Sequence, residues 1–334
     1  MRCISGNAAD RPMVLYHAVS SYQLLEVMLH RRAFHPEAKA VLLLPDFITA
    51  KYPRYKKLIP AFFDEVYLFP YLKIPHRGEP LVMQDAVRAY EQLVPYSLSD
   101  FQLIYIAGAH FYFSLCLIQR RIPFIFFEDA AGMLSRAGVL YDALHNRFPV
   151  HAAIARKHGL FDGSNPLVKQ IICLKSAQDR DVSSPRYQNF AVEEVLEEMP
   201  PRQRQRLIRF FIRRRIRAEA DAILLTQHFA NLGVMSREEQ QRLYTGLRDG
   251  SLQGLRLIIK PHPDDTLDYR GVFPDSYVIR EIFPAELLPY IFRRKPGTVC
   301  TLDSTGCENL RGHFRIIQLG RDHYADLTRF HPLQ

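Results

Sequence analysis

Short apolar runs alternate with longer amphipathic stretches over most of the chain. Runs rich in β-branched and aromatic residues predict strands, and apolar residues at helical spacing predict helices. The predicted strands span residues 13–17, 41–44, 65–69, 103–107, 123–127, 168–174, 222–226, 255–260, 276–280, 298–302 and 314–319. The predicted helices span residues 21–32, 81–93, 108–119, 236–248 and 304–310, and a further one opens at Pro284. Because many of these strands are apolar on both faces, the pattern is typical of a parallel sheet covered by helices on both sides.

The pattern of strands and helices occurs twice, with a less regular segment at 130–166 and a second run that begins after Arg202. A chain of 334 residues is long enough for two units of ~150 residues each. We therefore expect an α/β domain at 1–200 and another at 201–334, whose last residues can pack back on the first domain. Two such domains imply a cleft between them, with ligands at the carboxyl ends of strands.

The composition is that of an ordinary globular protein, with 48% hydrophobic and 24% charged residues. No apolar run approaches the ~20 residues of a membrane span, and the first residues do not form a signal peptide. The five cysteines contain no CxxC pair, which argues against a zinc ribbon and a disulfide framework. We expect a reducing, cytoplasmic setting.

The positive charge is concentrated in one segment. Residues 202–217 contain eight arginines and no acidic residue. Removing these eight from the 44 basic residues leaves 36, against 35 acidic residues, so the rest of the chain is nearly neutral. The segment is either a solvated helix face or a contact with an anionic surface through Arg213, Arg214 and Arg215. That surface would be the inner leaflet of a membrane or an acidic glycan.

Two adjacent carboxylates follow the apolar strand that ends at Phe127. Glu128 and Asp129 are expected to be partly desolvated and to face each other's charge. Both effects raise the pKa of a carboxyl group and suit a general base. The alternative is a strand-end turn with a capping aspartate.

A lysine and a histidine held between two prolines follow another strand, in the order Lys260, Pro261, His262 and Pro263. Prolines fix the backbone around the histidine, and an oriented imidazole beside a lysine suits phosphate binding or proton donation. The alternative is an exposed turn. Asp264 and Asp265 alone do not predict a metal site, since no further His or Asp cluster accompanies them in the sequence.

Hydroxyl groups follow two further strands. Ser304 and Thr305 open a predicted helix, where backbone N–H groups and hydroxyls can cradle a phosphate. The alternative is an ordinary helix cap. Thr226, Gln227 and His228, after the strand that begins at Ala222, give a weaker signal of the same kind. The sequence contains no GxGxxG after the first strand, no P-loop, no GxSxG elbow and no HExxH motif.

These motifs, in this order, resemble those of bacterial GT-B sialyltransferases of the polysialyltransferase and lipooligosaccharide sialyltransferase types. The matching residues are the acidic pair Glu128-Asp129, the His-Pro motif His262-Pro263 and the hydroxyl pair Ser304-Thr305. Glu286 matches a Pro-x-Glu segment between the last two motifs. The resemblance implies a GT-B fold, in which two Rossmann-like domains with parallel sheets face a central cleft.

The resemblance also implies an inverting transfer of sialic acid from CMP-sialic acid to a glycan or glycolipid hydroxyl, in capsule or surface-glycan synthesis. By this resemblance Glu128 or Asp129 is the base, and His262 assists departure of CMP as an acid or hydrogen-bond donor. The nucleotide-binding residues would be Lys260, Pro263, Glu286, Ser304, Thr305, Thr226 and Gln227. Neither a metal nor a cofactor is expected, and the enzyme would be cytoplasmic with a peripheral contact on the inner membrane face.

Three other functions compete with this one. Teichoic-acid-type enzymes that transfer an alditol phosphate from a CDP-alditol also carry His-Pro motifs on a GT-B fold, and a CMP-Kdo donor is a further alternative. The excess of basic residues suggests a nucleic-acid-binding protein. That alternative is disfavoured because no known binding module is evident in the sequence and tryptophan is absent.

Overall fold

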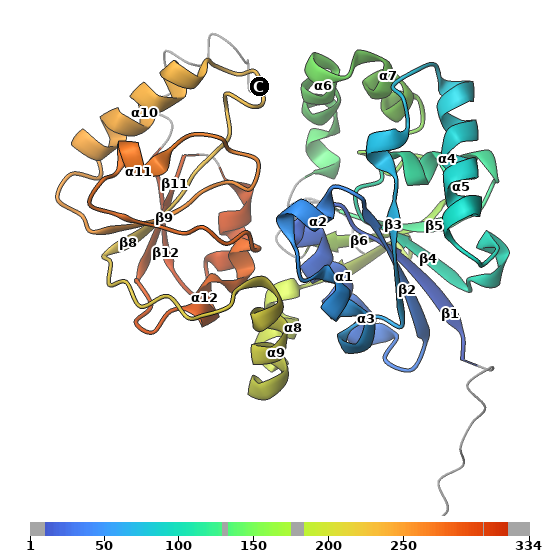
Figure 1. The fold of residues 1–334 in the computed structure, drawn as a ribbon, viewed down its shortest axis with the longest axis horizontal. Helices are drawn as coiled ribbons and strands as arrows, with labels where there is room; N and C mark the ends of the chain where they lie inside the picture. The colour runs from blue at the N-terminus through green and yellow to red at the C-terminus, as the bar shows by residue number, and fades with distance from the viewer. Residues whose placement is uncertain (1–10, 129–132, 175–183, 303, 320–334) are drawn as a thin grey trace, which may run out of the picture. The chain divides into compact units, whose positions relative to one another are not determined.

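The computed structural model describes residues 11–128, 133–174, 184–302 and 304–319. The chain divides into two compact units, unit 1 (Met1–Glu198) and unit 2 (Met199–Gln334), where the sequence predicts a boundary after residue 200 (Figure 1). The prediction that the last residues pack on the first domain concerns residues outside the described ones.

Unit 1 is built on a parallel sheet in the order β3-β2-β1-β4-β5-β6-β7. Its strands are β1 (Met13–His17), β2 (Lys39–Pro45), β3 (Glu65–Phe69), β4 (Leu103–Ile106), β5 (Phe124–Phe127), β6 (Val168–Leu174) and β7 (Tyr187–Phe190). Alternate residues of a strand point to opposite faces. Leu15 packs into the same core as Tyr90 and Phe113 of two covering helices, and its neighbour Val14 is buried on the other face. Burial on both faces explains why these strands are almost wholly apolar.

The helices of unit 1 are α1 (Ser21–Phe34), α2 (Ile48–Lys51), α3 (Leu58–Ala61), α4 (Glu79–Leu93), α5 (Tyr112–Gln119), α6 (Ala137–Arg147), α7 (Pro149–Lys157) and α8 (Val192–Glu198). Helix α5 begins four positions later than the sequence predicts. Gly108 has φ +73°, outside the helical region, and a Cβ there would lie 2.6 Å from Val19 Cγ2. The chain therefore needs a glycine and a turn between β4 and α5.

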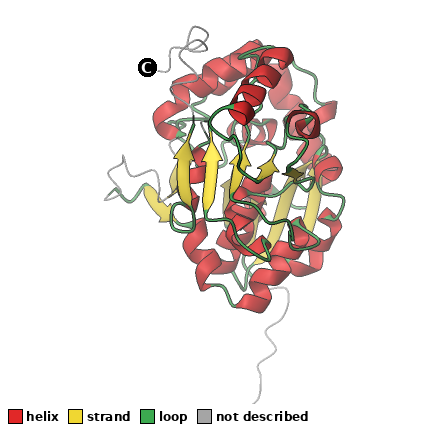
Figure 2. Cartoon of the chain, turned by 90° about the vertical axis from the view of Figure 1, so that its left-hand side faces the viewer, coloured by secondary structure: helices red, strands yellow, loops and turns green. Residues whose placement is uncertain are grey.

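Unit 2 repeats the same plan with five parallel strands in the order β10-β9-β8-β11-β12. These are β8 (Ala222–Leu225), β9 (Leu257–Lys260), β10 (Tyr277–Val278), β11 (Thr298–Thr301) and β12 (Arg315–Gln318). Figure 2 shows strands in yellow lying between red helices. Leu224 and Ile259 pack against Tyr244, whereas Ile223 and Ile258 are buried on the opposite face.

The helices of unit 2 are α9 (Pro201–Phe211), α10 (Arg237–Asp249), α11 (Tyr269–Val272) and α12 (Leu288–Ile291), with 3-10 turns at Ala285–Leu287 and Thr305–Leu310. Helix α10 begins with a capping box: the Ser236 hydroxyl accepts from the Glu239 N–H, and the Glu239 carboxylate accepts from the Ser236 N–H. This exchange satisfies two of the donors that a helix start leaves free.

The α/β interpretation with parallel sheets is confirmed, and two Rossmann-like units define the fold. Two local predictions are wrong. The segment predicted to be irregular contains α6 and α7, and the strand β7 was not predicted because its residues Tyr-Gln-Asn-Phe lack the apolar run of an interior strand. As an edge strand it has a neighbour on one side only, which removes the need for that run.

The described cysteines Cys116, Cys173, Cys300 and Cys307 are all buried and free of disulfide bonds, as the sequence predicts for them. Among the described residues, no helix has both the length and the apolar character needed to span a bilayer.

Candidate functional site

The polar strand ends of unit 2 lie around the point where the strand order reverses. From β8 the sheet grows toward β9 on one side and toward β11 on the other. In doubly wound sheets ligands bind outside the carboxyl ends of the strands at this reversal. Thr226, Gln227 and His228 follow β8, and Ser304 follows β11. The topology thus brings together groups that the sequence separates by more than 70 residues.

The loop after β9 carries His262 in a fixed orientation. The His262 N–H donates to Thr226 Oγ1 at 3.1 Å, and the Asp264 N–H donates to His262 Nδ1 at 3.2 Å. An imidazole nitrogen that accepts a hydrogen bond cannot carry a proton, so the proton of the neutral ring is on Nε2. His262 therefore presents an N–H donor from Nε2.

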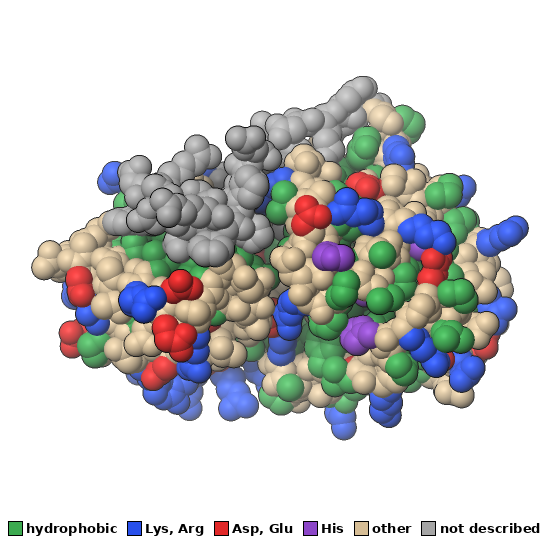
Figure 3. All heavy atoms as spheres, turned by 90° about the horizontal axis from the view of Figure 1, so that it is seen from above, with side chains coloured by type: hydrophobic (Ala, Val, Ile, Leu, Met, Phe, Trp, Pro, Cys, Tyr) green, Lys and Arg blue, Asp and Glu red, His purple; other side chains and the backbone are tan. Residues whose placement is uncertain are grey.

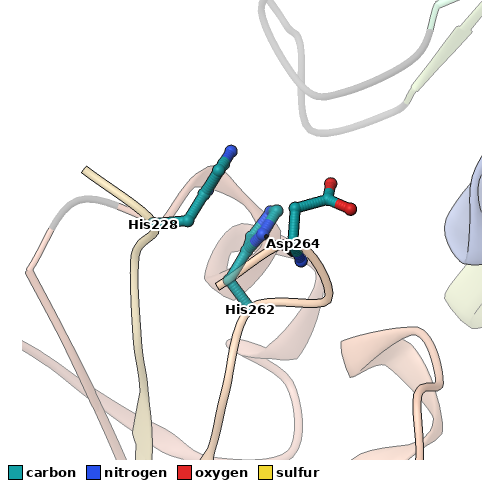
Figure 4. A group of neighbouring side chains, drawn as sticks. All are labelled: His228, His262 and Asp264. Carbon is teal, nitrogen blue, oxygen red and sulfur yellow. Dashed lines mark hydrogen bonds between the residues drawn. The ribbon is translucent and has the colours of Figure 1, made fainter. Parts of the chain in front are cut away.

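His228, which carries only a weak signal in the sequence and was not among the predicted site residues, stacks on His262 (Figure 4). The ring centroids are 3.6 Å apart and the ring planes differ by 10°. The only sequence signal was its position after the strand that ends in Thr226 and Gln227. Both imidazoles point in the same general direction from their two loops.

Hydrogen bonds tie these two loops together. Asn231 Nδ2 donates to the Asp264 carbonyl at 3.0 Å. The buried Gln240 of α10 accepts from the Ala230 N–H at 2.7 Å and donates to the Asp265 carboxylate at 2.9 Å. Asp265 is thus engaged inside the fold and holds the loop in place. The stacked histidines are a built feature of unit 2, since both of their loops are anchored to α10.

His228, His262 and Asp264 together could hold a metal ion, because one ligand atom from each lies within 4.8 Å of the others. The prediction that no further histidine accompanies the aspartates is therefore wrong. A metal ion, however, lies in the plane of each imidazole that binds it. Two rings stacked face to face cannot both bind one ion unless one of them turns. In the observed geometry the histidines suit hydrogen bonding to an anion better than metal coordination.

Lys260 is the last residue of β9, and it is buried. The pleat of β9 points it to the face opposite Ile259, where its ammonium lies 4.9 Å from the centre of the Phe283 ring. Burial lowers the pKa of Lys260 to about 8, and the charge of Glu286 partly opposes that shift. Glu286 is itself buried and accepts from Asn309 Nδ2 at 3.1 Å. A lysine with such a pKa still carries its charge at neutral pH.

The hydroxyl segment after β11 differs from its prediction. Residues 305–310 form a 3-10 turn, and the Ser304 N–H already donates to Thr301 Oγ1 at 3.1 Å. That N–H cannot also bind a phosphate, so any contact from Ser304 would come from its hydroxyl. Thr305 begins the turn, but its side chain lies outside the described residues. Pro263 and Gln227 are half-buried, and the Gln227 N–H donates to the Tyr244 hydroxyl at 2.6 Å.

In unit 1, Glu128 follows β5 and is fully buried, and its N–H donates to the Ile172 carbonyl at 2.9 Å. Asp129 lies outside the described residues. The neighbouring strands β1 and β4 end nearby in the sheet order, at His17 and Ile106. The carboxyl edge of unit 1, the side where ligands bind in such sheets, therefore carries a buried carboxylate and a buried histidine.

His17 is a polar strand-end residue that the sequence analysis placed in a strand and did not select. Its Nδ1 bonds to the Ala107 carbonyl and its Nε2 to the Tyr71 hydroxyl, both at 2.7 Å. Complete burial lowers the pKa of His17 to about 4. Since both ring nitrogens are occupied, His17 is a neutral structural group.

The arginine segment is only partly helical. Helix α9 ends at Phe211 and buries the apolar residues Leu207, Ile208, Phe210 and Phe211. Arg213, Arg214 and Arg215 follow the helix and are exposed.

The chain has the fold of GT-B enzymes. No known family model matches it. An α/β-galactoside α-2,3-sialyltransferase from Photobacterium phosphoreum is similar at TM-score 0.53 and 13% identity, over 92% of this chain and 90% of that one. A UDP-GlcNAc 2-epimerase from Methanocaldococcus jannaschii, bound to UDP-GlcNAc and UDP, has a TM-score of 0.52 and 9% identity, over 95% and 92%. Arabidopsis thaliana UGT89C1, in complex with UDP-L-rhamnose, has a TM-score of 0.52 and 13% identity, over 96% and 82%.

One curated relative is similar in sequence. It is an uncharacterized protein from Haemophilus influenzae, 36% identical over 83 residues. The match covers 25% of this chain and only 26% of that protein. The similarities to the solved structures establish the fold.

Proposed function

We propose that this protein is a glycosyltransferase that moves sialic acid from CMP-sialic acid to a glycan hydroxyl with inversion, in the synthesis of a bacterial surface glycan such as a capsule or lipooligosaccharide. The observation that carries the proposal is the group of cationic and hydrogen-bonding side chains at the strand reversal of unit 2. There the Nε2–H of His262, the Ser304 hydroxyl and the charge of Lys260 suit the phosphate of a departing nucleotide.

The reaction forms one bond and breaks one. The acceptor oxygen attacks the anomeric carbon of sialic acid, and the bond from that carbon to the phosphate oxygen of CMP breaks. The bonding electron pair passes to the phosphate. Attack from the face opposite the leaving group inverts the configuration.

Glu128 is the proposed general base. It takes the proton from the acceptor hydroxyl as the new bond forms. Its position directly after a buried strand keeps the carboxylate within the sheet edge and limits its contact with water. Asp129 is the alternative base in the same pair.

His262 is proposed to act as a neutral hydrogen-bond donor to the phosphate. In the structure, Nδ1 of this ring accepts a hydrogen bond from the Asp264 N–H. A neutral ring already carries the needed proton on Nε2. Because CMP is a stable phosphate monoester, it needs charge stabilisation more than full protonation when it leaves.

Lys260 and Glu286 are assigned to the nucleotide. Lys260 supplies positive charge from its buried position at the end of β9. The Glu286 carboxylate can accept hydrogen bonds from ribose hydroxyls. Thr226 supports the loop of His262 through its hydroxyl. With these groups in place the proposed reaction uses neither a metal nor a cofactor.

Other donors remain as alternatives on the same fold. A CDP-alditol would place a diphosphate at the same residues, and CMP-Kdo would differ only in the sugar. Two of the similar structures contain UDP or a UDP-sugar, so uridine nucleotides are the most informative competitors.

A thermal-shift screen tests the proposal. A ligand that binds only the folded protein at about 100 times its Kd stabilises it by ~2.7 kcal/mol. We expect CMP and CMP-sialic acid to raise the Tm, and His262→Ala to reduce the shift given by CMP. A shift with UDP-GlcNAc, CDP-glycerol or CDP-ribitol alone, or no shift with any cytidine nucleotide, would contradict the assignment of the donor.

A further inference from the structure

The arginines that follow α9 line a groove in unit 2. This groove, called the arginine groove below, consists of a part of about 1020 Å³ and an adjoining part of about 570 Å³ that share Tyr277 and Glu281. Its basic residues are Arg213, Arg214, Arg215, Arg217, Arg270 and Arg280. Figure 3 shows a group of Lys and Arg side chains along the lower left margin of the face in view.

The fold holds the arginines in an exposed position. Ile216 is buried, its N–H donates to the Ile291 carbonyl at 2.8 Å, and its carbonyl accepts from the Arg293 N–H at 2.9 Å. Neighbours of an inward residue in an extended segment point outward. Arg215 and Arg217 therefore project to the solvent side of the segment that Ile216 anchors.

The charge of the groove is not neutralised within the fold. Glu281 is the one acidic residue in the described lining, against six arginines, and two other nearby acids are engaged elsewhere, since Glu219 pairs with Arg294 and Asp221 with Arg256. Within the described part of the chain, none of the six groove arginines forms an ion pair. Like charges held this close together repel each other, and an anionic ligand would relieve the repulsion.

The other lining residues are suited to a carbohydrate. The Tyr277 side chain is 44% exposed and offers a ring face. Ser276 and the exposed Glu281 can exchange hydrogen bonds with hydroxyl groups. A carboxylate such as Glu281 accepts hydrogen bonds from sugar hydroxyls, and a phosphodiester group has no such donor to offer. The apolar side of α9 is buried, so this region has no apolar helix face to insert into a bilayer.

We propose that the arginine groove binds an acidic oligosaccharide, with arginines on its carboxylates and Tyr277 against a sugar ring. Guanidinium groups bind carboxylates through two parallel hydrogen bonds. The groove contains no residue from the loops after β8, β9 or β11, so it is separate from the proposed phosphate site. Binding of an acidic oligosaccharide in the arginine groove does not depend on the proposed function. Only the further inference that this oligosaccharide is a remote part of the acceptor rests on it.

Fluorescence anisotropy with labelled tetrasaccharides tests this site without a donor substrate. The probes are oligosialic acid and oligogalacturonic acid, with maltotetraose as the neutral control. We expect at least one acidic probe to bind at least tenfold more tightly than maltotetraose. Arg213→Ala with Arg215→Ala should weaken that binding at least tenfold, and Tyr277→Ala should weaken it several-fold. The matched control removes two exposed arginines of α9, Arg202→Ala with Arg206→Ala, and should leave binding unchanged.

Charge-preserving variants separate a carbohydrate from a membrane. Arg213→Lys with Arg215→Lys keeps the charge and loses the paired hydrogen bonds, so binding of the acidic probe should fall several-fold. Binding to phosphatidylglycerol vesicles or to a thymidine hexanucleotide that is tighter than to the acidic probes would overturn the proposal. So would equal binding of the neutral probe or indifference to both arginine pairs.

The same variants keep this site distinct from the donor site. We expect the Arg213→Ala, Arg215→Ala protein to retain its thermal shift with CMP, and His262→Ala to retain acidic-probe binding. If CMP fails to bind while the groove binds the probe, the donor assignment fails alone.

Discussion

The two units of this protein share one plan and differ in the chemistry at their strand ends. In unit 1 the carboxyl edge carries Glu128 and the neutral, fully bonded His17. In unit 2 it carries Lys260 and the stacked pair His228 and His262. One edge can therefore accept a proton, and the other can stabilise an anion.

The environments of His17 and His262 differ in burial, and burial decides which of these imidazoles is able to contact a ligand. His17 has both nitrogens bonded inside unit 1 and cannot reach a ligand. His262 accepts the Asp264 N–H on Nδ1 within its own loop and is half-buried, so its ring lies closer to solvent than that of His17. A shared fold thus does not give a shared function, because function depends on the residues that follow each strand.

The largest expected effect comes from removing the base in unit 1. Glu128→Gln keeps the size of the side chain and loses the proton acceptor, so we expect the transfer rate to fall by about 100-fold or more. Binding of CMP, measured by thermal shift, should not change because CMP is assigned to unit 2. Glu91→Gln, an exposed carboxylate of the same unit, serves as the control. A loss with Asp129→Asn and none with Glu128→Gln would transfer the role to Asp129.

The second effect concerns the proton on Nε2 of His262. His262→Ala should lower kcat by more than about tenfold. Glutamine can place an amide N–H near the position of Nε2, whereas asparagine reaches only the position of Nδ1. We therefore expect His262→Gln to be more active than His262→Asn in steady-state assays. Equal loss in both variants would indicate that His262 acts as a full acid, and full activity in His262→Ala together with Glu128→Gln would refute both assignments.

A smaller effect is expected from the buried lysine. With its pKa lowered from 10.5 to about 8, Lys260 binds fewer protons in the folded state than in the unfolded chain between these values. Its burial costs stability at pH 7, and stability rises as the pH increases from 8 to 10.5. Lys260→Met should raise the Tm at pH 7 and weaken CMP binding several-fold.

Calorimetry and CMP titrations between pH 7 and 9 check this prediction. Wild-type affinity for CMP should fall as the pH rises through 8, while the affinity of Lys260→Met stays constant. Lys295→Met, at an exposed lysine of unit 2, is the control. A lower Tm in Lys260→Met would show that the charge contributes stability through a partner.

The last prediction compares the acid stability of the two units. The pKa of His17 is lowered from 6.5 to about 4 and that of His110 to about 3, both by burial. The unfolded chain takes up these protons first, so unit 1 loses stability as the pH falls from 6.5 toward 4. In unit 2, His228 and His262 are half-buried, whereas His17 is completely buried.

Hydrogen exchange measured by mass spectrometry at pH 7 and pH 5, corrected for intrinsic rates, should show β1 losing protection before β8. His17→Gln should reduce the pH dependence in β1 peptides. Earlier loss of protection in β8 would contradict the comparison.

Local sequence determined the described strands apart from β7, and the helices α1, α4, α5 and α10. A strand buried on both faces must be apolar throughout, so runs such as Phe124–Phe127 are visible without any partner. The capping box of α10 is equally local, because its two residues are three positions apart. The sequence also located Lys260, His262 and Glu128, because a polar residue at the end of an apolar strand, or just after it, is easily recognised.

Tertiary structure alone decided which remote residues meet. The stacking of His228 on His262 depends on the adjacency of β8 and β9, and on the ties through Gln240. The arginine groove likewise needs Tyr277 from another strand. Contacts of this kind arise from the order of strands in a sheet, which is set by the packing of the whole unit. A linear pattern records what each segment buries, and it contains no record of which segments lie side by side.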